Sequence, residues 1–184
     1  MRIAFDLDDT LIPRMYSFPT EQRRRKLIRR MFDRVISSPP MWIMERLVRS
    51  LMHRLFGDVP LRKGAADLLR SLAADGHDIW IYTTSLRTPF QIRQLFGFVG
   101  ITPGGIVNGD IHARRVRGLV PELRSTSKYP PAFGIDVLVD DSEGVVLDGK
   151  KFGFPVIYIR PDDVNWVGTV REAVRGLCVQ KLAA

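Results

Sequence analysis

The chain has 184 residues and a formal net charge of +8, and 45% of its residues are hydrophobic. This balance predicts one globular domain, or a core domain with a modest insertion, and excludes a disordered or fibrous chain. The single cysteine, Cys178, excludes a disulfide framework and any cysteine-based zinc site. No apolar run approaches the ~18 residues of a membrane span. Because Met1 leads directly into a strand-like run rather than a signal segment, we expect a cytoplasmic protein.

Short apolar runs that are rich in Val and Ile and lack alternation predict strands covered on both faces, as in a parallel sheet. These runs are residues 3–5, 79–82, 137–139 and 155–159. Apolar residues at helical spacing predict helices over residues 64–75, 89–96 and 164–177. The alternation predicts an α/β fold, a three-layer Rossmann-like core around a parallel sheet. Within residues 97–127 only one short strand is indicated, near 106–107, and we expect Asp148, between two glycines, to occupy a turn.

Positive charge is concentrated in one segment near the front of the chain. Residues 14–63 hold 13 Lys and Arg against four acids, whereas the remainder holds 15 against 16. Apolar stripes over residues 20–36 and 40–56, separated by Pro39-Pro40, predict a helical hairpin inserted after the first strand. Such a basic segment attracts phosphorylated metabolites, nucleic acid or an acidic membrane surface. We therefore predict a core of residues 1–13 and 61–184 and an all-helical, Arg-rich insertion of residues 14–60.

Carboxylate and hydroxyl side chains follow three of the predicted strands. Asp6 and Asp8 follow the first, Thr83 follows the second, and Asp140 and Asp141 end a third. Ligands of an open parallel sheet bind at the carboxyl ends of its strands, so we expect these side chains to lie together. Neighbouring carboxylates repel one another unless a cation neutralises them, and oxygen ligands favour Mg²⁺ over zinc or copper. The sequence therefore predicts a magnesium site.

The run Asp6-Leu7-Asp8-Asp9-Thr10 directly after a strand resembles the DxDxT signature of the haloacid dehalogenase (HAD) superfamily, mainly aspartate-nucleophile phosphohydrolases. Thr83, Lys128 and Asp140-Asp141 follow in that superfamily's order. The resemblance covers about 140 residues of the core and not the basic hairpin. For residues 14–60 it implies a C1-type cap, a helical lid over the phosphoryl site.

The resemblance also implies a role for each matching residue. Asp6 would attack phosphorus and form an aspartyl-phosphate, and Asp8 would act first as general acid and then as general base. Thr83 would donate a hydrogen bond to a phosphoryl oxygen, and Lys128 would balance negative charge. The implied cofactor is Mg²⁺. Its implied ligands are Asp6, the backbone carbonyl of Asp8 and Asp140, with Asp141 contributing through water or by orientation. Which of Asp140 and Asp141 contacts the metal directly stays open.

Several assignments keep an alternative. Thr84 or Ser85 could serve as phosphate-binding hydroxyl in place of Thr83. Lys128 is the only lysine between Thr83 and Asp140, and its alternative is a solvated loop lysine. The three histidines lack a partner at metal-pair spacing and are expected to be structural or exposed: His53, His77 and His112.

These patterns predict a Mg²⁺-dependent phosphomonoester hydrolase acting on a small anionic phosphorylated substrate. Arg14, close in sequence to Asp8, is the cap residue expected to reach a substrate anion. One alternative is a nucleic-acid-associated protein or end-processing phosphatase that uses the basic hairpin. Another is a non-catalytic module that binds an anion or an acidic membrane. The sequence leaves the substrate, the oligomeric state and the choice between hydrolysis and phosphotransfer open.

Overall fold

The computed structural model describes residues 1–13, 61–85, 87–97, 100–116, 118–119 and 121–183. The predicted helical cap at residues 14–60, and Arg14 with it, lie outside the described residues. Within the described part of the chain, no helix combines the length and apolar character needed to cross a membrane.

Five parallel strands form one sheet in the order β3-β2-β1-β4-β5. The strands are β1 (Arg2–Phe5), β2 (Asp78–Tyr82), β3 (Gly105–Val107), β4 (Val137–Asp140) and β5 (Val156–Tyr158). The central strand β1 is covered on both faces, since Ile3, Ala4 and Phe5 are fully buried. This burial explains its uninterrupted apolar run and confirms the predicted parallel α/β sheet.

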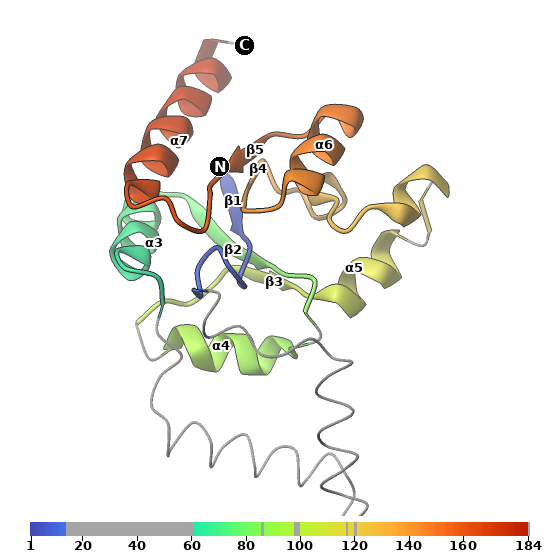
Figure 1. The fold of residues 1–184 in the computed structure, drawn as a ribbon, viewed down its shortest axis with the longest axis horizontal. Helices are drawn as coiled ribbons and strands as arrows, with labels where there is room; N and C mark the ends of the chain where they lie inside the picture. Colours follow the sequence, from blue (N-terminus) through green and yellow to red (C-terminus); the bar gives the residue numbers. More distant parts are fainter. Residues whose placement is uncertain (14–60, 86, 98–99, 117, 120, 184) are drawn as a thin grey trace, which may run out of the picture. The chain divides into compact units, whose positions relative to one another are not determined.

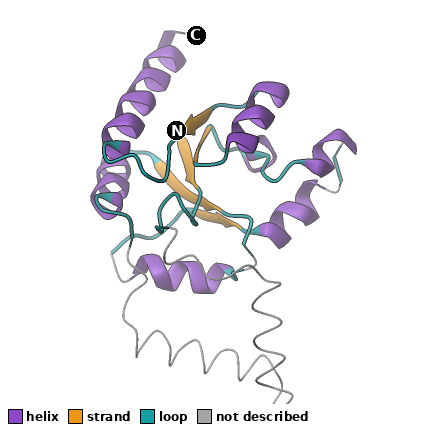
Figure 2. Ribbon diagram, in the orientation of Figure 1, coloured by secondary structure: helices purple, strands orange, loops and turns teal. Residues whose placement is uncertain are grey.

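Helices cover both faces of this sheet. They are α3 (Ala65–Ala74), α4 (Pro89–Gly97), α5 (Gly109–Val116), α6 (Glu143–Phe152) and α7 (Trp166–Ala183). Figure 1 shows α3 with α7 on one side of the sheet and α5 with α6 on the other, and Figure 2 shows the helices surrounding the strands. On α3 the residues Ala65, Leu68, Leu69 and Leu72 are buried, three or four positions apart, as expected for a helix that packs one face on a core.

Two regions differ from the sequence prediction. The sequence indicated only one short strand within residues 97–127. The structure adds helix α5 and the 3₁₀ segment Pro121–Ser125 there, and a second 3₁₀ segment, Pro130–Phe133, just beyond it. The turn expected at Asp148 was wrong, because the residue lies within α6. The neighbouring Gly149 serves packing: a Cβ there would lie 2.8 Å from both the Phe154 carbonyl oxygen and a methyl group of Val156.

The strand order locates the point where a ligand is expected to bind. From β1 the chain proceeds outward through β2 and β3, and it then returns to place β4 on the other side of β1. The carboxyl ends of β1 and β4 therefore border the crevice at which the winding direction reverses, the usual ligand position in open α/β sheets. Asp6 follows β1 directly, and Asp140 ends β4.

Candidate active site

The loop after β1 folds back on itself and fixes the direction of its carboxylates. The backbone N–H of Ile12 donates to the carbonyl of Leu7 at 2.8 Å, and the N–H of Asp9 donates to the carbonyl of Ile12 at 2.8 Å. Asp9 has a φ of 67°, a left-handed conformation that aspartate tolerates better than most residues. This tight turn holds Asp6 and Asp8 at the carboxyl end of the central strand.

Asp6, Lys128 and Asp140 form a buried charge cluster. The Lys128 Nζ lies 2.5 Å from Asp6 Oδ1 and 2.6 Å from Asp140 Oδ2, and its side chain is 3% exposed. The other Asp140 oxygen accepts a hydrogen bond from the Ser142 backbone N–H at 2.9 Å. When both carboxylates are ionised, one cation between them leaves a net negative charge where burial makes such charge costly. A proton on one carboxylate or a further cation relieves this charge.

The cluster shifts the titration of its members. Burial raises the pKa of the Asp6 carboxyl to about 7, although Lys128 opposes this rise. Burial by itself would lower the pKa of Lys128, but the carboxylates of Asp6 and Asp140 raise it above the ordinary lysine value. Lys128 therefore remains a permanent positive charge at this site.

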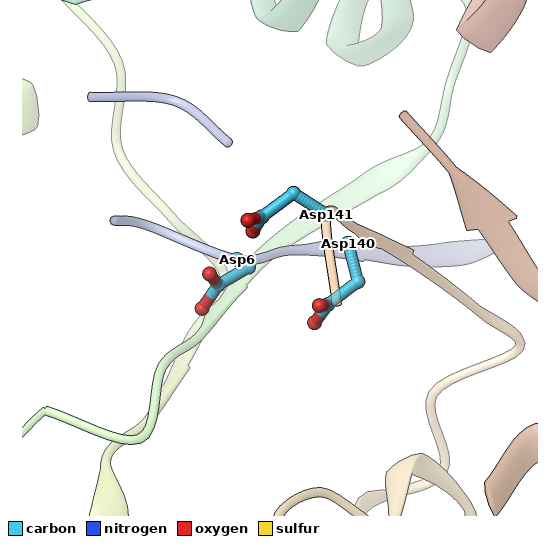
Figure 3. Close-up of side chains that lie close together, drawn as sticks. All are labelled: Asp6, Asp140 and Asp141. Atoms are coloured by element: carbon cyan, nitrogen blue, oxygen red, sulfur yellow. The ribbon is translucent and has the colours of Figure 1, made fainter. Parts of the chain in front are cut away.

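Three carboxylates come close enough to share an ion. Asp6, Asp140 and Asp141 each offer an oxygen, and these oxygens lie within 4.8 Å of one another; Figure 3 shows the three carboxyl groups at the ends of β1 and β4. Oxygens this close together could hold one small cation, and carboxylate oxygens are ligands that Mg²⁺ takes. Thr10 orients Asp141, because its buried hydroxyl donates to Asp141 Oδ1 at 3.0 Å.

Of the candidate hydroxyl groups after β2, Thr83 is the buried one. Its side chain is 1% exposed, its backbone N–H donates to the Val107 carbonyl at 2.9 Å, and its Oγ1 accepts from the Ser85 backbone N–H at 3.1 Å. Because Oγ1 acts as acceptor in that contact, its proton can be donated elsewhere. Thr84 is exposed. This arrangement favours Thr83 over Thr84 as a donor to a bound anion.

Asp8 is bound by an arginine that the sequence analysis did not single out. The Arg87 Nη1 donates to both Asp8 oxygens, at 2.9 and 2.6 Å. The backbone of Arg87 is held in turn by Asn108, whose Nδ2 donates to the Arg87 carbonyl at 2.9 Å while its Oδ1 accepts from the N–H of Ile111 in the first turn of α5. Asp8 and Arg87 thus form a partly exposed ion pair beside the buried cluster.

The structure brings Asp6, Lys128, Asp140 and Asp141 into one cluster, with Asp8 on the loop that begins at Asp6. Sequence reasoning missed Thr10, Arg87 and Asn108. The available signals were weak: Thr10 completes the DxDxT run, Arg87 lies four residues after Thr83, and Asn108 directly follows the short third strand.

Comparison with known proteins gave structural likenesses only. No family model matches the chain, and no curated protein matches its sequence. The chain is similar in structure to a HAD-like family hydrolase from Porphyromonas gingivalis, with 15% identity, coverage of 95% of this chain and 97% of the other, and a TM-score of 0.49. It is also similar to CbbY from Rhodobacter sphaeroides in complex with xylulose-1,5-bisphosphate, with 18% identity, coverage of 86% of this chain and 85% of the other, and a TM-score of 0.46. A HAD-superfamily hydrolase from Ehrlichia chaffeensis shows 14% identity, coverage of 86% of each chain and a TM-score of 0.45.

Proposed function

We propose that the chain is a HAD-type phosphohydrolase, a Mg²⁺-dependent phosphomonoesterase that works through an aspartyl-phosphate on Asp6. The observation that carries the proposal is the buried cluster in which Lys128 bridges Asp6 and Asp140, while an oxygen of Asp141 lies within 4.8 Å of an oxygen of each of these two aspartates. A structural ion pair would need one carboxylate for one lysine. Three carboxylates at the switch point of a parallel sheet are an arrangement suited to binding a cation and a phosphoryl group together.

The residues present supply a balanced reaction. An Asp6 oxygen forms a bond to phosphorus while the bond from phosphorus to the leaving oxygen breaks. Asp8, protonated and released from its ion pair with Arg87, gives that oxygen a proton. Water then attacks phosphorus, gives a proton to Asp8 and breaks the bond to Asp6. Inorganic phosphate leaves, and both carboxyl groups are restored. During both displacements Lys128 and Thr83 stabilise the negative charge on the phosphoryl oxygens.

The donor set fits Mg²⁺. Asp6, Asp140 and Asp141 offer only oxygen ligands, and within the described residues no histidine or cysteine belongs to this cluster. When bound, the ion would neutralise phosphoryl and carboxylate oxygens, which reduces repulsion between the nucleophile and its anionic substrate. The protein's own contribution is to orient the ligands, chiefly through Thr10 on Asp141.

The position of Arg87 supports an anionic substrate. Asp8 acts on the leaving oxygen, and Arg87 contacts Asp8, so the guanidinium lies on the leaving-group side of the reaction. Arginine offers planar paired donors that suit carboxylate and phosphate groups. A substrate whose leaving group carries a second anion would gain a contact with Arg87, whereas a plain aryl phosphate would not.

A phosphate-release screen tests the proposed function. Phosphorylated metabolites, nucleotides, phosphorylated oligonucleotide ends and a generic aryl phosphate are incubated with the enzyme in Mg²⁺ and in EDTA. We expect turnover that needs Mg²⁺ and is lost in Asp6→Asn. Asp162→Asn is the matched control, because it changes an exposed aspartate paired with Arg160. Turnover by Asp6→Asn at the rate of Asp162→Asn contradicts the mechanism. If the folded wild-type protein releases no phosphate from any compound of the panel, the proposed activity is contradicted.

The alternatives of nucleic-acid or membrane binding depend on the basic segment of residues 14–60, which lies outside the described residues. They are separated from the proposal by a gel shift at low and high salt and by co-sedimentation with anionic vesicles. Binding of nucleic acid without phosphate release from any oligonucleotide end would favour the first of them.

A further inference from the structure

A second buried polar network lies beside the charge cluster and links β2, α5 and the segment that carries Lys128. The Tyr82 hydroxyl lies 2.5 Å from His112 Nδ1 and accepts a hydrogen bond from the Tyr129 backbone N–H at 2.8 Å. The other ring nitrogen of His112, Nε2, lies 3.0 Å from the Thr126 carbonyl oxygen. The side chains of Tyr82 and His112 are both buried.

The partners fix the position of every proton in this network. The Thr126 carbonyl can only accept, so His112 Nε2 carries a hydrogen and donates it. In a neutral imidazole, His112 Nδ1 then has a lone pair and accepts from the Tyr82 O–H. All donors and acceptors are satisfied when the imidazole is neutral and the phenol protonated. Burial keeps both in these forms, since it lowers the pKa of His112 and raises that of Tyr82.

The two anchored backbone groups flank Lys128. Thr126 lies two residues before it and Tyr129 directly after it, and residues 126–129 belong to no helix or strand. Without a sheet ladder or helix to order it, this segment depends on such side-chain anchors. The Tyr82 ring itself is held in the core, where it meets Phe133 edge-to-face at 5.5 Å between ring centroids.

We propose that Tyr82 and His112 are positioning residues that hold the segment 126–129 and so place the Lys128 ammonium between Asp6 and Asp140. This proposal rests on the proposed function for its catalytic consequence, although the anchoring is a property of the structure alone. Tyr82 also ends β2 and directly precedes Thr83. The same network therefore fixes the position of Lys128 relative to β2, the strand that positions the Thr83 hydroxyl. A displacement of about 1 Å in such a group can cost about 100-fold in rate.

A double-mutant cycle separates positioning from general structural support. Tyr82→Phe keeps the ring and removes the hydroxyl, and we expect kcat to fall by about 10–100-fold. In a Lys128→Met background the same change should have almost no further effect on kcat, because the group it positions is gone. Tyr158→Phe removes a hydroxyl from a partly exposed side chain of β5 and is the chemistry-matched control. Val174→Ala, in the buried face of α7, is the control for lost stability.

Two further measurements keep the test independent of turnover. Hydrogen exchange at the Tyr129 amide should be slow in the wild type and faster in Tyr82→Phe, with no such change in Tyr158→Phe. The affinity for inorganic phosphate in Mg²⁺ should weaken in Tyr82→Phe and in Lys128→Met. If the wild type releases no phosphate from any substrate, the proposed function fails while these two measurements still decide the positioning claim.

The outcomes that overturn the proposal are specific. Tyr82→Phe with wild-type kcat and wild-type phosphate affinity refutes it, even if the Tyr129 amide exchanges faster, because the segment would then be loosened without consequence for Lys128. An equal loss of kcat from Tyr82→Phe in the presence and absence of Lys128 also refutes it, because Tyr82 would then act by another route. A loss of kcat in Val174→Ala equal to that in Tyr82→Phe has the same meaning.

Discussion

The buried Asp6 carboxylate should reduce the stability of the metal-free protein, and this cost should depend on pH. Burial raises the pKa of Asp6 from 3.8 to about 7. The folded protein therefore binds more protons than the unfolded chain between about pH 4 and pH 7, and the free energy of unfolding falls as pH rises through this window. Three pKa units correspond to about 4 kcal/mol.

Asp6→Asn removes this titration and nearly preserves the shape of the side chain. In EDTA we expect its free energy of unfolding, relative to wild type, to improve by about 3 kcal/mol between pH 5 and pH 8. Mg²⁺ at 100 times its Kd binds the wild-type carboxylate and adds about 2.7 kcal/mol to the free energy of unfolding of the wild type. It should therefore remove most of the stability difference between Asp6→Asn and the wild type at pH 8. Urea unfolding followed by far-ultraviolet circular dichroism at several pH values measures both effects.

Asp162→Asn is the control, because Asp162 is exposed and lies outside the cluster. A difference between Asp6→Asn and wild type that stays constant from pH 5 to pH 8 in EDTA would refute the reasoning. It would mean that Asp6 is ionised throughout this range and that Lys128 fully compensates for its burial.

Three other predictions concern single contacts. Arg87→Ala should raise KM for substrates with an anionic leaving group and leave KM for an aryl phosphate nearly unchanged, as measured by steady-state kinetics. Thr10→Val removes the donor to Asp141 and should weaken Mg²⁺ binding by about 10–100-fold in a calorimetric titration. Gly105→Ala places a Cβ 2.4 Å from the Trp80 indole and should cost about 1–3 kcal/mol of stability in urea unfolding.

Each of these has a result that contradicts it. An equal change of KM for both substrate types would mean that Arg87 does not discriminate between leaving groups. Mg²⁺ affinity unchanged in Thr10→Val would show that Asp141 needs no orientation by a hydroxyl. Wild-type stability of Gly105→Ala would mean that β3 can move away from the indole at little cost.

The central strands could be predicted from the sequence because burial on both faces gives them a continuous apolar run that stops at a polar residue. The run that ends at Asp6 and the one that ends at Asp140 are of this kind, and their carboxyl ends meet as the rule for parallel sheets requires. The resemblance to the HAD superfamily implies a lysine between Thr83 and Asp140, and Lys128 is the only lysine in that stretch. Helix α5 was missed because its short sequence, with Gly109 and two adjacent arginines, lacks an extended apolar stripe.

Contacts between distant side chains were beyond sequence reasoning. Thr10 and Asp141 are 131 residues apart, and Tyr82 and His112 are 30 apart, so their pairing depends on the folded arrangement of several elements. His112 was expected to be structural or exposed, and its buried position fits the first of these. What the sequence does not reveal is that both of its ring nitrogens are used, one of them on the segment that carries Lys128.

The most direct test of the account is to trap the phosphoryl-enzyme. Wild type, Asp6→Asn and Asp162→Asn are mixed with an aryl phosphate and Mg²⁺, quenched in acid during turnover, digested and examined by mass spectrometry. The account predicts one added phosphoryl group on the peptide that contains Asp6 in wild type and in Asp162→Asn, and none in Asp6→Asn. Continued phosphate release by Asp6→Asn, or a phosphoryl group on another residue of the wild type, would contradict the assignment of Asp6 as the nucleophile.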